Sequence, residues 1–138
     1  MIDTSTPFGA RAERRLQEEP IAWLVTVQPD GMPQPVPVWF LWESETFLIY
    51  SRPATPKLRN IARNPRVALH LDGNGRGGDI VVVTGEASVS EGEPPADRVP
   101  AYVVKYAELI ELNGWTPQSF AEDYSVALRV RFGSLRGH

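Results

Sequence analysis

The stretch that decides the fold is WLVTVQPDGMPQPVPVWFLW, residues 23–42. It predicts a strand over 21–28, because β-branched and aromatic residues run there without a break. Asp30 and Gly31 follow within the segment 29–33, and Asp-Gly is typical of a hairpin turn. Residues 34–42 are then expected to return as a second strand. The stretch therefore predicts an antiparallel β-hairpin.

Three prolines, Pro33, Pro35 and Pro37, alternate along the second strand of this hairpin. Alternate backbone N–H groups of an extended strand point to the same side, so the prolines remove three donors from one edge. One interpretation is an edge strand protected against aggregation. The other is a deliberate split in a barrel, where a flat heteroaromatic ligand meets the strand. Aromatic residues follow at once and could form the wall of such a site or part of the core: Trp39, Phe40 and Trp42.

The remaining elements are predicted from periodicity and from proline and glycine boundaries. Helices are expected over 7–19, 56–64, 94–113 and 117–123, and further strands over 46–51, 66–72, 79–91 and 124–136, with a bulge or bend at Gly85. Most connections are short, so the sheet should be mainly antiparallel. We expect one domain over 1–138, a mainly β (α+β) fold, with six antiparallel strands in a split β-barrel and flanking helices.

The composition excludes several classes of site. The chain has 138 residues, a net charge of −3 and no cysteine, and its histidines are His70 and His138. Disulfides, thiolate metal sites and a metal site built from several histidines are therefore excluded. No apolar run is long enough for a membrane span, and the N-terminal residues show no signal-peptide pattern. We expect a cytoplasmic protein that acts on a small molecule and binds neither nucleic acid nor membrane.

A second group of polar residues follows the strand 46–51. The group surrounds the expected start of a helix at Thr55 and Pro56 and comprises Ser51, Arg52, Thr55, Lys57, Arg59 and Asn60. Hydroxyls, cations and free helix N–H groups each favour an anion, so together they predict a phosphate site. The alternative is a solvated basic face of the helix.

The glycine-rich segment 73–78, GNGRGG, matches a dinucleotide-binding pattern literally. That pattern must open a helix, whereas DIVVVTGEASV follows here and predicts a strand. We therefore interpret 73–78 as a hairpin loop. His70 is expected on the solvated face of its strand, and no motif identifies a catalytic residue.

Two blocks of the sequence, 23–42 and LIYSRPATPKLRNIARNPRVAL over 48–69, resemble the pyridoxamine 5′-phosphate oxidase-like split barrels. The similarity is greater to the branch of small reductases that use coenzyme F420, a deazaflavin. The rest of the chain matches only in layout. The resemblance implies a homodimer with two cofactor sites at the subunit interface.

The resemblance also implies which residues bind the cofactor. Residues of the proline-rich strand would line its ring, and residues after the third strand would hold its phosphate: Pro35, Val36, Pro37, Val38 and Trp39, then Tyr50, Ser51, Arg52, Lys57 and Asn60. The expected activity is hydride transfer from reduced F420 to an unsaturated acceptor. An FMN-dependent oxidase or reductase and a non-catalytic flavin- or tetrapyrrole-binding protein remain as alternatives. Neither the catalytic residue nor the acceptor can be named from the sequence.

Overall fold

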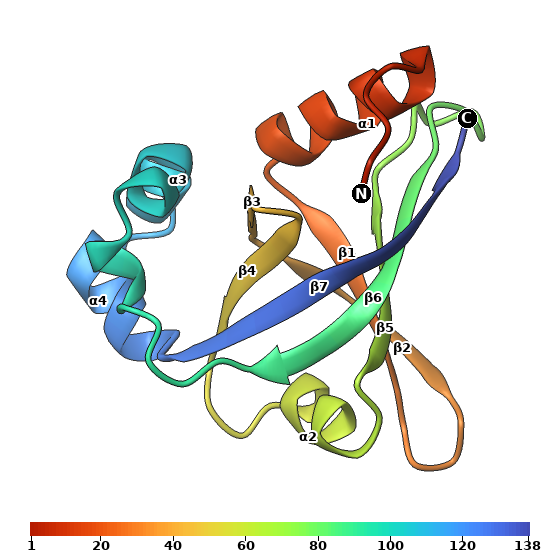
Figure 1. Ribbon diagram of the computed structural model, residues 1–138. Coiled ribbons are helices and arrows are strands. Elements are labelled where there is room, and N and C mark those ends of the chain that lie inside the picture. Colours follow the sequence, from red (N-terminus) through yellow and green to blue (C-terminus); the bar gives the residue numbers. More distant parts are fainter.

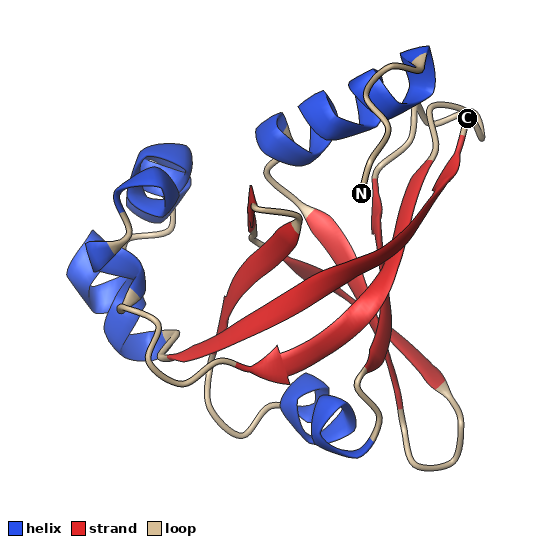
Figure 2. Ribbon diagram, in the orientation of Figure 1, coloured by secondary structure: helices blue, strands red, loops and turns tan.

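The computed structural model describes residues 1–138 as a curled sheet with helices around it (Figures 1 and 2). The strands are β1 Ala22–Val27, β2 Pro33–Val38, β3 Leu41–Glu43, β4 Thr46–Ser51, β5 Arg66–Leu71, β6 Val81–Val89 and β7 Val126–Gly137. The helices are α1 Pro7–Glu18, α2 Pro56–Arg63, the short 3₁₀ helix Ala96–Arg98, α3 Pro100–Leu112 and α4 Pro117–Asp123. The predicted helices and strands are thus present, with a 3₁₀ turn at the start of the segment 94–113.

All seven strands belong to one antiparallel sheet in the order β2–β1–β5–β6–β7–β4–β3. The sheet curls but leaves β2 and β3 as its two edges, which is consistent with a split barrel. The prediction of six strands was wrong by one, because residues 34–42 form two strands. The chain turns at Trp39 and Phe40, between β2 and β3.

Contacts from helix α3 hold this turn in place. The Phe40 N–H donates to the hydroxyl of Tyr106 (2.7 Å), and the Lys105 ammonium donates to the Phe40 carbonyl (2.8 Å). Backbone groups that would otherwise pair with a strand are therefore satisfied by side chains. This explains why a continuous apolar run does not form a continuous strand.

The hydrophobic residues form two clusters with β4 between them. Helices α1 and α2 cover opposite ends of the curled sheet (Figure 1) and contribute Ala12, Leu16 and Ile61 to the barrel core. The second cluster joins α3 and α4 to the outer side of β4. Phe47 and Ile49 of β4 face the barrel core, and Leu48 and Tyr50 face the helices, as expected for side chains that alternate across a strand.

A bulge or bend was predicted at Gly85, and a bulge lies there, with Gly133 of β7 as its extra residue. The register of β6 against β7 shifts between Thr84 and Gly85, and a β-carbon at Gly85 would lie 2.1 Å from the Arg131 carbonyl oxygen. Only glycine permits this close approach of the two backbones.

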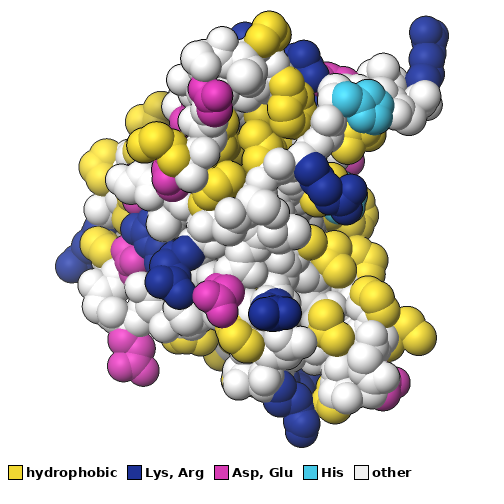
Figure 3. Space-filling view, turned by 45° about the vertical axis from the view of Figure 1, so that its right-hand side comes forward, with side chains coloured by type: hydrophobic (Ala, Val, Ile, Leu, Met, Phe, Trp, Pro, Cys, Tyr) yellow, Lys and Arg dark blue, Asp and Glu magenta, His cyan; other side chains and the backbone are white.

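None of the helices combines the length and apolar character needed to cross a bilayer. On the face drawn in Figure 3, charged side chains of both signs lie scattered among hydrophobic ones.

Candidate functional site

The proline-bearing edge of β2 is unpaired, as predicted. The Gln28 N–H donates to the Met32 carbonyl at the hairpin turn, so hydrogen-bonded pairs alternate from that position onward. Pro33, Pro35 and Pro37 face Val27, Val25 and Trp23, which are the non-hydrogen-bonded positions of the pair. Their backbone groups therefore point away from β1. This edge offers carbonyl acceptors at three alternate positions and no donors there.

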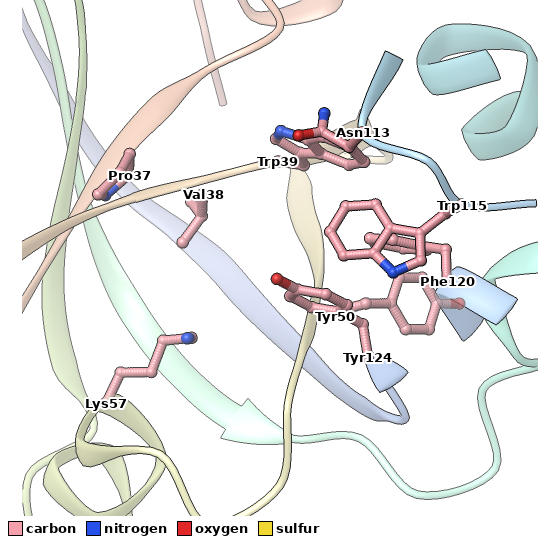
Figure 4. A pocket seen from close by; sticks show the side chains of 9 residues that line it. All are labelled: Pro37, Val38, Trp39, Tyr50, Lys57, Asn113, Trp115, Phe120 and Tyr124. Atoms are coloured by element: carbon pink, nitrogen blue, oxygen red, sulfur yellow. The ribbon is translucent and has the colours of Figure 1, made fainter. Parts of the chain in front are cut away.

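A cavity of about 280 Å³ opens beside the end of this edge (Figure 4). Its lining comes from β2 and the turn after it, from β4, from α2, and from the segment 113–124 that follows α3 and includes α4. The lining residues are Pro37, Val38, Trp39, Tyr50, Lys57, Asn113, Trp115, Phe120 and Tyr124. The structure thus brings together five of the ten residues predicted to bind the cofactor.

Lys57 is the only charged side chain that lines the cavity. Pro56 fixes the first turn of α2 and places Lys57 next to it, so that the side chain points into the cavity (Figure 4). It forms no ion pair. Burial lowers the pKa of this half-buried ammonium group from its ordinary value. An anion in the cavity would provide the opposite charge that Lys57 lacks within the chain.

Ser51 and Asn60 lie beside the cavity but do not line it. The Ser51 hydroxyl donates to the Arg52 carbonyl (2.8 Å) and lies 3.2 Å from the Thr55 hydroxyl. The Asn60 amide donates to the Thr26 hydroxyl (3.0 Å). Both side chains are buried and tie the β4–α2 loop and α2 to the sheet. Their proposed contact with a phosphate stays a prediction. Their observed contacts hold the loop and the helix that carry Lys57.

Arg52 is exposed at the rim of the cavity. Its guanidinium lies 5.0 Å from the centre of the Tyr124 ring, a cation–π arrangement. The Tyr124 hydroxyl and the Asp123 carboxylate nearby raise the pKa of Arg52, so this group stays charged. A second cation is thus available where the cavity meets solvent.

Pro35 and Val36 do not line the cavity. Pro35 is exposed on the free edge of β2, and Val36 packs against the barrel core. Phe40 and Trp42 are both buried in that core, and the Trp42 indole N–H donates to Glu13. Of the three aromatic residues after the prolines, Trp39 alone lines the cavity.

Sequence reasoning missed four residues of the site. Asn113 and Trp115 lie between α3 and α4, Phe120 lies in α4, and Tyr124 follows α4 directly. Three aromatic residues follow the Gly114 helix stop within ten positions, and this pattern could have indicated a ring-binding surface. Their partners, however, lie on β2 and β4, and periodicity alone does not connect such distant segments.

The interpretation of 73–78 as a loop is confirmed, since it joins β5 to β6 in an antiparallel hairpin. No helix follows the glycines. His70 is half-buried on the outer side of the sheet and stacks against Trp23, with 6.4 Å between ring centres.

The comparison with protein families shows to which family the chain belongs. The family model for pyridoxamine 5′-phosphate oxidase matches residues 8–138. The chain belongs to the pyridoxamine 5′-phosphate oxidase family. No curated protein matches its sequence.

Solved structures similar to this pyridoxamine 5′-phosphate oxidase family member differ in what they are described as binding. An F420 reductase is 27% identical, with a TM-score of 0.63 over 89% of this chain and 94% of the other. A FAD-binding protein from Mesorhizobium loti is 19% identical, with a TM-score of 0.65 over 91% and 90%. The heme storage protein HutZ from Vibrio cholerae is 16% identical, with a TM-score of 0.65 over 96% and 95%. The last two show the shared fold alone.

Proposed function

We propose that this protein is an oxidoreductase that uses coenzyme F420 to reduce an unsaturated small molecule. The observation that carries the proposal is Lys57, an ammonium group without an ion-pair partner that faces a cavity beside a strand edge without donors. A flat ring with an anionic tail matches both features. The 27% identity to an F420 reductase favours F420 over FMN.

The residues of the cavity fit such a coenzyme by their chemistry. Lys57 would hold an anionic oxygen, and Arg52 at the rim would hold negative charge further along the tail. Pro37 and Val38 present a flat apolar surface to the ring, and the Pro37 carbonyl can accept a hydrogen bond from a ring N–H.

When bound, reduced F420 supplies a hydride. The protein's own part is to orient the reactants and to exclude water with the apolar and aromatic lining. No carboxylate and no histidine lines the cavity, so the proton that completes the reduction would come from solvent or from another group beside the substrate.

We also propose that the protein is a homodimer. The outward side of β1, β5 and β6 carries half-buried apolar residues where a solvated sheet face is normally polar: Trp23, Val25, Val27, Ala68 and Val82. A shallow hollow of about 680 Å³ lies on this face and is lined partly by Val25, Val27 and Ala68. A second copy of the chain would cover these side chains.

Titration of the coenzyme-free protein with F420 and with FMN, side by side, tests the proposed function. F420 is expected to bind more tightly, and the reduced form should be oxidised when an acceptor is added. Preferential binding of FMN would replace the proposal with an FMN-dependent enzyme. Binding of F420 without turnover of any acceptor would favour a storage or sensing protein.

A further inference from the structure

Lys105 is a half-buried amine that the proposed function does not use. It belongs to α3 and lies outside the cavity, whose lining contains the other lysine of the chain, Lys57. Its side chain is partly exposed, and its ammonium nitrogen contacts the β2–β3 turn. A nucleophilic group in this position is open to reagents that approach from solvent.

The surroundings of the Lys105 nitrogen are mainly apolar. The nitrogen lies 3.8 Å from the centre of the Phe40 ring and 5.3 Å from that of the Tyr106 ring, and it donates to the Phe40 carbonyl (2.8 Å). It forms no ion pair, and the carboxylate of Glu19, the residue that ends α1, acts on it only from a greater distance. Two aromatic rings and one carbonyl thus replace much of the water that keeps an ordinary surface lysine protonated.

These surroundings favour the neutral form of the amine. Burial lowers the pKa of Lys105 to about 8, and Glu19 opposes this change. At pH 7.5 about one Lys105 side chain in four is then neutral, against about one in a thousand for an ordinary lysine. Only the neutral amine has the free electron pair that attacks an electrophile, so desolvation activates a lysine as a nucleophile.

We propose that Lys105 is an acylation site for small acyl phosphates. The amine nitrogen attacks the acyl carbon, the bond between that carbon and the phosphate oxygen breaks, and the phosphate leaves with the proton that the amine loses. The product is a neutral amide with one N–H, which can still donate to the Phe40 carbonyl. The fold accepts this product because the reaction removes a charge from apolar surroundings and keeps a hydrogen bond.

Acetylation by acetyl phosphate, with each site quantified by mass spectrometry, tests the proposal. The rate at Lys105 is measured at pH 7.5 in the folded protein and in the chain unfolded by guanidinium chloride. The amine of Met1, a residue that is 94% exposed, is the internal reference under both conditions. A less basic amine is also a weaker nucleophile, which offsets part of the gain in neutral amine. Relative to Met1, we therefore expect Lys105 to react roughly three- to tenfold faster in the folded protein.

The pH dependence of the rate and two variants make the test sharper. In the folded protein the rate at Lys105 should level off above about pH 8, whereas in the unfolded chain it should rise until about pH 10. Glu19→Gln removes a charge that favours the ammonium form and should raise the folded rate at pH 7.5. Glu111→Gln, at an exposed position further along α3, is the control and should not.

Two results would overturn the acylation site. One is a rate at Lys105 that, relative to Met1, is equal in the two states or lower in the folded protein, as expected for an ordinary lysine that its surroundings shield. The other is a folded rate that keeps rising to about pH 10, because the amine would then titrate like an unperturbed lysine.

Discussion

The hydroxyl oxygen of Tyr106 lies 2.7 Å from the backbone nitrogen of Phe40 and accepts its hydrogen bond. The same hydroxyl lies 2.7 Å from the Pro20 carbonyl oxygen and 2.9 Å from that of Phe40, so it can donate its own proton to one of them. Because Phe40 follows Trp39 directly, this contact between α3 and the β2–β3 turn also fixes the position of Trp39. A helix outside the barrel thus determines the shape of the cavity.

We therefore predict that Tyr106→Phe destabilises the protein. The change leaves the buried Phe40 N–H without its acceptor, which costs about 1–3 kcal/mol. The urea concentration at half-unfolding should fall while the ring contacts remain. Tyr124→Phe is the control, because that side chain is only half-buried. An unchanged midpoint for Tyr106→Phe would show that water replaces the hydroxyl.

Lys57→Met is predicted to weaken F420 binding by roughly ten- to a hundredfold, since a hydrogen bond to a charged group contributes about 1.5–3 kcal/mol. Stability should change little, because burial already disfavours the charged form of Lys57. Arg63→Met, exposed on the same helix, is the matched control. If Lys57→Met and the parent bind F420 equally well, Lys57 does not hold the phosphate and the proposed phosphate site is wrong.

Gly85→Ala is predicted to destabilise the sheet. Its new methyl group would lie 2.1 Å from the Arg131 carbonyl oxygen, so one of the two strands must move. We expect a loss of about 2 kcal/mol or more in the free energy of unfolding, measured by urea denaturation. Ser88→Ala, at an exposed position of the same strand, should be nearly neutral. A small effect at Gly85 would mean that the bulge can relax.

Lys105 predicts a pH dependence of stability. Burial lowers its pKa from 10.5 to about 8, against a smaller opposing effect of Glu19. Between about pH 8 and 10 the unfolded chain then holds more protons at this site than the folded one, so stability rises with pH. The free energy of unfolding of the parent should increase over this range relative to Lys105→Met. Parallel curves for the two proteins would contradict the lowered pKa.

The proposed dimer predicts a sedimentation mass near twice the chain mass of 15.4 kDa. Val25→Lys, on the apolar outer face of β1, should shift the protein toward the monomer because it places a charge in the covered surface. Val104→Lys, at a position 81% exposed on α3, should not. A parent that sediments as a monomer at micromolar concentration would exclude the dimer.

Local patterns were sufficient to predict most of the secondary structure. The Asp-Gly turn, the alternation in 66–72 and the glycine bulge are encoded within a few residues, and each was confirmed. The break of 34–42 into β2 and β3 was not predictable in this way. It depends on Tyr106 and Lys105, more than sixty positions further along the chain.

The site was only partly predictable for the same reason. Lys57 could be identified from its place at a helix start after a strand. Ser51 and Asn60 carry the expected polar groups, but Arg52, Thr55 and Thr26 provide hydrogen-bond partners within the chain. Residue type alone does not show whether a side chain binds a ligand or its neighbours. Trp115, Phe120 and Tyr124 were missed because they lie far along the chain from Trp39 and Tyr50, which line the same cavity.

The segment from Ser90 to Ser125 leaves the sheet and returns to nearly the same point, since Val89 faces Leu128 across the β6–β7 pair and the Ser90 N–H donates to the Ala127 carbonyl. Trp115, Phe120 and Tyr124 therefore all belong to one segment that is inserted between the two strands of the β6–β7 hairpin. Exchange of this segment would keep the barrel that carries Lys57 only if the new segment also made the contacts of Tyr106 and Lys105 with Phe40. Under the proposed function, a chimera made at these two junctions with another F420-dependent relative would transfer acceptor preference.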